Sequence, residues 1–323
     1  MRRTGRSEII SLFLSLGLLG VAGGAAATWL APLHHLFDLV AMFASPALTC
    51  AVIGLLLAAV ARRWPMAGGF VAAGLALLLA LRPQWFPAHP APPAAVEPAR
   101  VYFANVWARN HEVDAIARSV AEADADVVAM VEITDEHAAA LPRILKAYPY
   151  RTSSRPARFF AGGPRAIVAS KWPLRKAAAV QDGLAAEDVI VSAPFGEFRL
   201  IAVHLTRPWP LDGRKGEQID QTVRLAQRIR YGEQVPALAV GDFNATAACH
   251  VLSDFAGKGG VRPAPARTGT WPGFLPLPFR IAIDNAFVGP GLTVTARETG
   301  AANGSDHSPI IVEVAPSAGG KLP

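Results

Sequence analysis

The first quarter of the chain is almost continuously apolar. Between Ile9 and Leu81 the only interior charges are Asp38, Arg62 and Arg63. A helix that crosses the hydrocarbon core of a bilayer needs about 20 largely apolar residues. The pattern predicts three such helices, at residues 9–30, 39–61 and 64–81, of which the third is short and rich in glycine. We therefore expect residues 1–82 to form a transmembrane region.

Basic residues set the expected direction of insertion. Arg2, Arg3 and Arg6 precede the first apolar segment, and a patch of small residues follows at 23–27, so a cleaved signal peptide is the alternative interpretation of that segment. In either case the basic N-terminus and the Arg62–Arg63 turn are expected in the cytoplasm. The third helix then leads the rest of the chain to the outer side of the membrane.

The pattern changes after residue 82. Residues 83–99 are rich in proline and alanine, which is typical of an extended, semi-rigid linker. In residues 100–315, short apolar runs alternate with amphipathic stretches, and residues 316–323 are expected to form a flexible tail. Strands are predicted at 100–106, 126–133, 166–170, 188–193, 198–205, 237–243, 281–288 and 308–314, and helices at 112–123, 134–146 and 217–231. This mixture predicts an α/β sandwich in which helices cover packed sheets.

Composition narrows the possible classes of function. Residues 1–99 hold six arginines and three acids, and the remainder holds the other 25 basic and 22 acidic residues, so each part carries +3 of the net +6. Such a mildly basic domain does not predict binding to DNA. Cys50 and Cys249 are not expected to pair, which excludes a disulfide framework and a cysteine metal site. The sequence contains no Gly-x-Ser-x-Gly motif, so it gives little support to a serine hydrolase.

Polar side chains follow several of the predicted strands. The run Gly-Asp-Phe-Asn-Ala-Thr at 241–246 comes directly after an apolar strand, and Ser-Asp-His at 305–307 comes directly before one. Gly-Asp-x-Asn alone also marks ordinary turns. Together with Glu132 and His204, both in apolar surroundings, the two runs indicate a polar site at the strand ends and favour a metal-assisted phosphoester hydrolase.

A series of short motifs extends this interpretation. In chain order these are Asn105 in Ala-Asn-Val-Trp, Glu132 in Met-Val-Glu-Ile, His204 in Val-His-Leu, Gly-Asp-Phe-Asn at 241–244, Ile-Asp at 283–284 and Ser-Asp-His at 305–307. They resemble the endonuclease/exonuclease/phosphatase superfamily, over about two-thirds of the chain. The strand-then-proline run at 167–174 and Thr-Trp-Pro at 270–272 resemble the same family, and the apolar N-terminal part resembles its membrane-anchored bacterial branch.

The resemblance implies a fold, a location and a cofactor. The fold would be a four-layer sandwich of two mixed β-sheets flanked by helices. The protein would be a multi-pass protein of the bacterial cytoplasmic (inner) membrane, with the catalytic domain on its outer, periplasmic or extracellular, side. Glu132 would be the main metal ligand, with Asn105 and Asp306 close by, and oxygen ligands of this kind suit Mg²⁺ or Mn²⁺.

The resemblance also implies roles in hydrolysis. Asp242 would orient and deprotonate the attacking water, and Asn244 would position the water or the phosphate. Asp284 would hold His307, which would donate to a phosphate oxygen, and His204 would face the same phosphate.

Other interpretations of these residues stay open at the level of sequence. Glu132 could cap a buried strand, Asn105 could hold a turn, and His204 could be a core histidine. A nuclease, a phospholipid phosphodiesterase and a phosphatase would share the same residues, so the substrate is a nucleic acid, a phospholipid or a small phosphate ester. No protein partner is implied. A non-catalytic membrane scaffold that retains the fold is the alternative function.

The chain departs from the family pattern in two places. Asn285 follows Asp284, where many relatives carry an aromatic residue or histidine. Residues 137–181 contain no acid that could support His204. That stretch is basic instead, which is typical of a solvated surface or of a funnel for an anionic substrate. Arg165, directly before a predicted strand, is the candidate substrate-binding residue.

Overall fold

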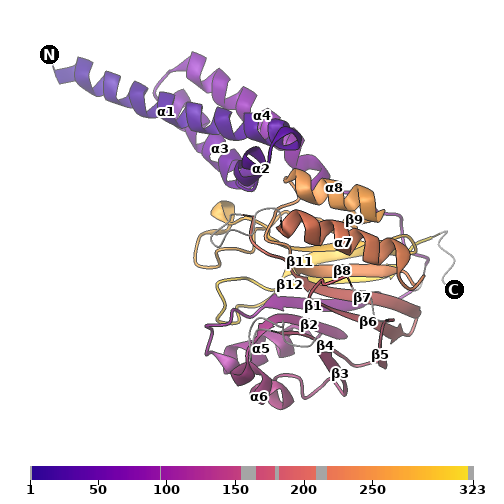
Figure 1. Cartoon of the computed structure of the whole chain (residues 1–323). Coiled ribbons are helices and arrows are strands. Elements are labelled where there is room, and N and C mark those ends of the chain that lie inside the picture. The colour runs from indigo at the N-terminus through magenta and orange to yellow at the C-terminus, as the bar shows by residue number, and fades with distance from the viewer. Residues whose placement is uncertain (1, 95, 154–164, 179–181, 209–216, 319–323) are drawn as a thin grey trace.

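The computed structural model describes residues 2–94, 96–153, 165–178, 182–208 and 217–318. Its first part is a bundle of four helices that lies at one end of an α/β domain (Figure 1). The helices are α1 (Arg2–Leu30), α2 (His35–Ala41), α3 (Ala44–Val60) and α4 (Trp64–Trp85), with the short 3-10 helix η1 (Ala31–Leu33) after α1. In the described residues, Glu8–Leu33 and Trp64–Trp85 are long and apolar enough to cross a membrane, and α2 with α3 could form a third, bent span.

The expectation of one continuous helix at 39–61 was wrong. Helices α2 and α3 meet at a break and differ in direction by 57°. Pro46 stands at the third position of α3 and explains the break. It has no N–H to donate to the carbonyl of Met42, and its ring clashes with that carbonyl in a continuous helix.

The α/β domain contains two sheets of six strands. The strand order is β11-β12-β1-β2-β4-β3 in the first sheet and β5-β6-β7-β8-β10-β9 in the second. The first sheet consists of β1 (Ala99–Asn105), β2 (Val127–Ile133), β3 (Tyr150–Ser153), β4 (Arg165–Ser170), β11 (Leu292–Thr299) and β12 (Ile310–Pro316). The second consists of β5 (Leu174–Lys176), β6 (Ala186–Ala193), β7 (Gly196–His204), β8 (Ala237–Asp242), β9 (Arg262–Pro263) and β10 (Asp284–Val288). Strand pairs β1–β2 and β7–β8 are parallel and the others are antiparallel, so both sheets are mixed.

Helices cover the outer face of each sheet. Helices α5 (Val113–Ala123) and α6 (Asp135–Ile144) lie on the first sheet, and α7 (Glu217–Tyr231) and α8 (His250–Gly259) lie on the second (Figure 1). The inner faces of the two sheets pack against each other through one apolar core, and each outer face has its own core with its helices. The structure is therefore a four-layer sandwich, which confirms the predicted fold class.

All eight predicted strands and all three predicted helices of the domain are present, whereas β3, β5, β9, β11 and α8 were not predicted. Strands β3, β5 and β9 are only four, three and two residues long. Strand β11 is exposed over much of its length and carries Arg297 and Glu298, so it lacks an apolar run. Helix α8 contains two glycines, which disfavour a helix in a sequence pattern.

The segment after α4 lies against the α/β domain. His89 contacts the Pro263 carbonyl through Nε2 at 2.9 Å, and Thr293 donates from Oγ1 to the Pro90 carbonyl at 2.5 Å. At the C-terminal end, Pro316 is the last residue of β12, and residues 319–323 of the predicted tail lie outside the described residues. The two free cysteines confirm that Cys50 and Cys249 do not pair.

The helix bundle is joined to the domain by a charged contact. The carboxylate of Asp38 in α2 accepts hydrogen bonds from the backbone N–H groups of His250 and Val251. These groups belong to the first turn of α8, where a helix has unpaired N–H donors and a partial positive charge. Met42 packs into the apolar core between the second sheet and its helices.

Gly241 of β8 has a steric role that predicts a stability change. A Cβ atom at this position would lie 2.2 Å from the carbonyl oxygen of Val203 in the neighbouring strand. We expect Gly241→Ala to destabilise the protein by about 1–3 kcal/mol, as overpacking of a core does. The melting temperature of the detergent-solubilised chain measures this, with Gly257→Ala as the control.

Gly257 lies in α8, and a Cβ atom there would have no neighbour within 4 Å outside its helix. Gly257→Ala is therefore expected to leave the melting temperature unchanged or to raise it. Equal melting temperatures for the two variants would contradict the steric role of Gly241.

Candidate active site

Three neighbouring strands of the second sheet bring three site residues into line. In the register of β7, β8 and β10, His204 pairs with Asp242, and Asp242 pairs with Asp284. Side chains alternate between the faces of a strand. Leu238 and Val240 lie in the core between the sheets, so Asp242, two residues on, belongs to the same inner face. The same alternation places His204 and Asp284 there.

The first sheet contributes Asn105 and Glu132 from β1 and β2. The side chain of Asn105 faces the inner side of its sheet, because Val101 and Phe103, which precede it at alternate positions of β1, lie in the inner core. Glu132 does not fit this alternation. Val131 before it lies in the inner core and Ile133 after it lies in the outer one. The register of β2 with β4 shifts between Met130 and Ile133, and Glu132 has φ +60°. This bulge in the left-handed region turns the Glu132 carboxylate inward, a strained conformation often found at functional sites.

The amide of Asn105 connects carboxylates from the two sheets. Its Nδ2 donates to Glu132 Oε1 and to Asp242 Oδ2, both at 3.0 Å. Its Oδ1 accepts from the backbone N–H of Trp107 at 2.9 Å, which fixes the orientation of the amide. Glu132 Oε2 also accepts from the N–H of Ala108 at 2.8 Å. Asn105 thus contacts both acids directly, and it does so through Nδ2 rather than Oδ1.

The two carboxylates differ in their electrostatic surroundings. Burial raises the pKa of Glu132, but the charge of His204 and the hydrogen bonds from Ala108 and Asn105 outweigh it, so its pKa is below the ordinary value. Burial dominates at Asp242 and raises its pKa above the ordinary value, against the opposing charge of His307. The surroundings thus shift the pKa values of the two carboxylates in opposite directions.

Asp284 and His307 form a buried pair, as predicted. Nδ1 of His307 lies 2.9 Å and 3.2 Å from the two oxygens of Asp284, and its Nε2 lies 3.8 Å from Asp242 Oδ2. Burial lowers the pKa of His307, but Asp284 and Asp242 reverse the effect and raise its pKa to about 10. The imidazole is therefore protonated at neutral pH, with Nδ1 directed to Asp284 and Nε2 toward Asp242.

His204 and Asn244 complete the group in different ways. His204 Nε2 lies 3.6 Å from Glu132 and 3.7 Å from Asp242, and with 36% of its side chain exposed it is the most open member of the group. Asn244 has φ +49°, and its N–H donates to Asp242 Oδ1 at 2.8 Å. Its side-chain nitrogen donates to the Leu205 carbonyl at 2.9 Å. Asn244 therefore holds the turn around Asp242 as well as lying beside it.

Asp306 and Arg165 lie apart from these contacts. Asp306 accepts from Trp271 Nε1 through Oδ2 at 3.1 Å, and its Oδ1 is buried without a hydrogen-bond partner among the described residues. Arg165 forms an ion pair with Asp135, at the start of α6. Four other members of the basic stretch are also ion-paired: Arg143 with Asp114, Lys171 with Asp124 and Asp126, Arg175 with Glu197 and Glu233, and Lys176 with Glu187. Arg151 donates instead to the Tyr148 and Leu145 carbonyls. Arg155 and Arg158 lie outside the described residues.

Several supporting residues were not identified from the sequence. Ser305 donates from Oγ to the Asn105 carbonyl at 2.8 Å and accepts from the N–H of His307. Gln218 of α7 donates to the carbonyls of Phe243 and Asn244, and Arg297 donates to the Asp284 carbonyl at 2.7 Å. Only Ser305 belongs to a motif that could have revealed it. Asn285, where the chain departs from the family pattern, has a structural role. Its side chain is buried and donates to the Ala245 and Ala282 carbonyls.

The donors of the site fit a hard divalent cation. They are carboxylate oxygens of Glu132, Asp242 and Asp306, without cysteine, and such oxygens suit Mg²⁺ or Mn²⁺. Atoms of Asp242, Asp284 and His307 also lie within 4.8 Å of one another. The His307 charge already compensates that trio, whereas the buried, unpaired Oδ1 of Asp306 needs a donor or a cation. Among these donors, Oδ1 of Asp306 is therefore the buried atom that a bound cation would satisfy.

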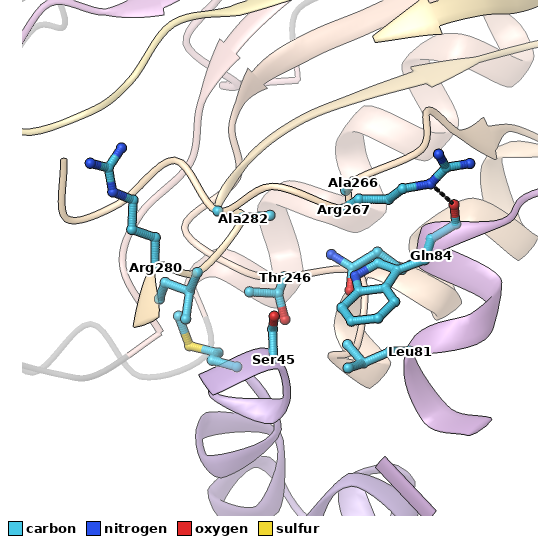
Figure 2. Close-up of a pocket in the computed structure, with 12 residues that line it drawn as sticks. Ser45, Leu81, Gln84, Thr246, Ala266, Arg267, Arg280 and Ala282 are labelled. Carbon is cyan, nitrogen blue, oxygen red and sulfur yellow. Dashed lines mark hydrogen bonds between the residues drawn. The ribbon is translucent and has the colours of Figure 1, made fainter. Parts of the chain in front are cut away.

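A small cavity lies at the junction of the bundle and the domain, and none of these groups lines it. Its volume is about 10 Å³, enough for about one water molecule. Figure 2 shows Ser45 and Leu81 from the bundle opposite Ala266 and Ala282 from the domain. The cavity therefore belongs to the packing of the two parts rather than to the acidic site.

The structure is an α/β sandwich in which acids and histidines from the two sheets converge at one end. Residues 101–307 match the sequence profile of the Endonuclease/Exonuclease/phosphatase family. The chain therefore belongs to the Endonuclease/Exonuclease/phosphatase family. Its predicted membership of the superfamily is confirmed. No match was found among curated proteins.

Solved structures agree on the fold. A mannosyl-6-phosphatase of Bacteroides thetaiotaomicron VPI-5482 is 18% identical, with 67% of this chain and 99% of that chain covered and a TM-score of 0.55. An endonuclease/exonuclease/phosphatase of Beutenbergia cavernae DSM 12333 is 18% identical, with 69% and 72% covered and a TM-score of 0.53. TDP2 of D. rerio, in complex with a single-strand DNA product, is 17% identical, with 67% and 98% covered and a TM-score of 0.52.

The Asp284–His307 pair predicts a pH dependence of stability. The pKa of His307 is raised from 6.5 to about 10. The pair's contribution is therefore complete below about pH 6.5 and is lost as the pH rises through about 10. We expect the gap in melting temperature between the unaltered chain and Asp284→Asn to be largest near about pH 6 and to shrink toward about pH 10. The melts are run in EDTA so that no cation contributes, and a constant gap would contradict the pairing.

Proposed function

We propose that this protein is a membrane-anchored, divalent-metal-dependent phosphoester hydrolase. One observation carries the proposal: Glu132 from one sheet and Asp242 from the other converge on the same amide of Asn105. Two carboxylates held together in a buried site repel each other, which costs free energy that a purely structural role does not return. The arrangement is useful where a cation and a phosphate must be held together.

The residues of the second sheet suit activation of water. Asp242 is buried and has a raised pKa, so it can accept a proton more readily than an ordinary carboxylate. Asn105 and the N–H of Asn244 each bond one of its oxygens and fix its direction. A fixed base near the attacking water lowers the entropy cost of reaching the transition state.

His307 and His204 are suited to donate hydrogen bonds to the phosphate of the substrate. Asp284 holds Nδ1 of His307, which leaves the Nε2–H of the protonated ring free to donate to a phosphate oxygen as negative charge grows there. His204, the most exposed member, faces the same space from the end of β7 and would donate to the phosphate or to the leaving oxygen.

Glu132 and Asp306, with Asn105 beside them, would hold the cation. A bound Mg²⁺ or Mn²⁺ ion supplies charge stabilisation to phosphoryl oxygens and helps to orient them. Arg165 is a weaker candidate for substrate binding, because its guanidinium is already paired with Asp135.

The substrate is a phosphoester, and the structural relatives cover several kinds. One is a mannosyl-6-phosphatase and another is bound to single-strand DNA. At 18% and 17% identity they support the fold and not a particular substrate for this chain. The apolar helices support a location at a membrane, and the basic residues at the N-terminus and at Arg62–Arg63 favour an outer, periplasmic or extracellular side.

The catalytic assignment predicts a loss of turnover without a loss of fold. Asp242→Asn keeps the shape of the side chain but removes its basicity. We expect hydrolysis of bis(p-nitrophenyl) phosphate by the full chain to require Mg²⁺ or Mn²⁺ and to fall by about 100-fold or more in this variant. Asp254→Asn, in α8 and ion-paired with Lys258, is the control and should keep full activity.

Melting curves on the same preparations separate this account from a scaffold that retains the fold. A folded Asp242→Asn protein with full activity would refute the catalytic role. A chain that hydrolyses no phosphoester in the presence of either cation would favour the scaffold.

The proposed topology has its own test. Alkaline phosphatase is active only outside the cytoplasm, so a fusion placed after residue 92 should be active, and a fusion after Arg63 should be inactive. Fluorescent reporters of cytoplasmic location should give the reverse pattern. Activity of the cytoplasmic reporter at residue 92 would reverse the proposed orientation.

A further inference from the structure

One loop of the α/β domain lies against both the candidate site and the helix bundle. This segment, the 271–280 loop, joins β9 to β10 and contains the 3-10 helix η2 (Leu277–Phe279). At its start, Trp271 Nε1 donates to Asp306 Oδ2 at 3.1 Å, and the N–H of Gly273 donates to the Asp306 carbonyl at 2.6 Å. At its end, Arg280 donates to Ser308 Oγ at 3.0 Å. The loop is thus fixed to the segment that carries His307.

The middle of the loop contacts α3. Thr49 donates from Oγ1 to the Pro278 carbonyl at 2.9 Å. Helix α3 has 17 residues and is about 25 Å long, slightly less than the hydrocarbon core of about 30 Å that it would cross. Thr49 lies five residues after the start of the helix. In a membrane that α2 and α3 cross together, Thr49 lies about 8 Å beyond the start of α3, so its contact with Pro278 lies near the outer edge of the hydrocarbon.

The side chains of the loop suit that depth. Phe274, Leu277 and Phe279 are 81%, 53% and 38% exposed, and residues 272–279 contain no charge. A contiguous apolar surface of this kind is uncommon on a domain surrounded by water and is typical of contact with a protein or a membrane. Its continuity with α3 identifies the membrane as the surface that it faces. Arg267, stacked on Phe86 at the end of α4, offers a cation at the level of the headgroups.

We propose that the 271–280 loop inserts into the outer leaflet and that the site takes its phosphoester from a membrane lipid. Phe274 is three residues from Trp271, so the two Cα atoms are at most about 11 Å apart. A headgroup phosphate can therefore reach the site while the acyl chains stay in the leaflet.

This substrate class rests on the proposed function. In the reaction, the oxygen of water forms a new P–O bond, one P–O ester bond breaks, and the leaving oxygen takes up the proton that the water loses, so that it departs as an alcohol. Hydrolysis of a lipid phosphoester in this way needs no further reactant.

Insertion of the loop can be measured without any activity. We would spin-label Phe274→Cys in a Cys50→Ser background, where Cys249 remains but is only 2% exposed. The full chain is reconstituted in vesicles of phosphatidylethanolamine and phosphatidylglycerol. The label at 274 should collide more with oxygen than with a water-soluble nickel chelate.

Tyr150→Cys provides the matched control. Tyr150 is 41% exposed on β3, on the opposite side of the domain from the bundle (Figure 1), and its label should favour the nickel chelate. Equal accessibility of the two labelled positions to the nickel chelate would overturn insertion of the loop.

The lipid substrate is tested with Phe274→Ser combined with Leu277→Ser. We expect hydrolysis of the vesicle phospholipids to fall at least about 10-fold, while hydrolysis of soluble bis(p-nitrophenyl) phosphate is unchanged. A proportional loss on both substrates would overturn the lipid assignment. If the unaltered chain hydrolyses neither substrate, the proposed function fails, whereas the depth of the label still decides the position of the loop.

Discussion

The site depends on the compensation of acidic charge where the two sheets meet. Glu132, Asp242 and Asp284 come from three strands and are all at least half-buried, so their ionised forms oppose one another and resist burial. The Asn105 amide bridges the first two, and protonated His307 compensates the second and third. Each of these links joins separate strands or loops. The contacts that offset the repulsion between the ionised acids therefore also fix the positions of these side chains.

The alternation of side chains along the strands explains why the acids meet. In β1, β7 and β8, the residues that precede the site fill the inner core, and the polar residue follows them on the same face. In the antiparallel strand β10 the order is reversed, since Asp284 comes first and Ala286 and Val288 follow it in the inner core. Hydrophobic packing thereby sets the direction of Asn105, His204 and Asp242 with no cost in backbone strain. Glu132 is the exception, because it needs the bulge and a positive φ to face inward. The strained residue is the one with the clearest proposed role in binding a cation.

Most of the strands and of the candidate site residues could be predicted from the sequence, because apolar runs with a period of two indicate strands and the motifs lie at the ends of those strands. The Asp284–His307 pair was expected and is present. The amide orientation of Asn105 was not, because it depends on the Trp107 N–H and on a neighbouring strand. The pairing of Arg165 with Asp135 and the break at Pro46 were also missed. The ion pair depends on a partner that the periodicity does not contain, whereas the break follows from one proline inside a run that is otherwise uniformly apolar.

The central claim is that Glu132 binds a divalent cation beside Asn105 and Asp242, and calorimetric titration of the full chain with Mn²⁺ tests it most directly. Glu132→Gln removes a charge and a ligand atom, and should weaken binding by more than the roughly 10- to 100-fold that loss of an outer-shell partner costs. Glu136→Gln, at an exposed carboxylate four residues further on, should bind Mn²⁺ as the unaltered chain does. Unchanged affinity in a folded Glu132→Gln protein would contradict the account.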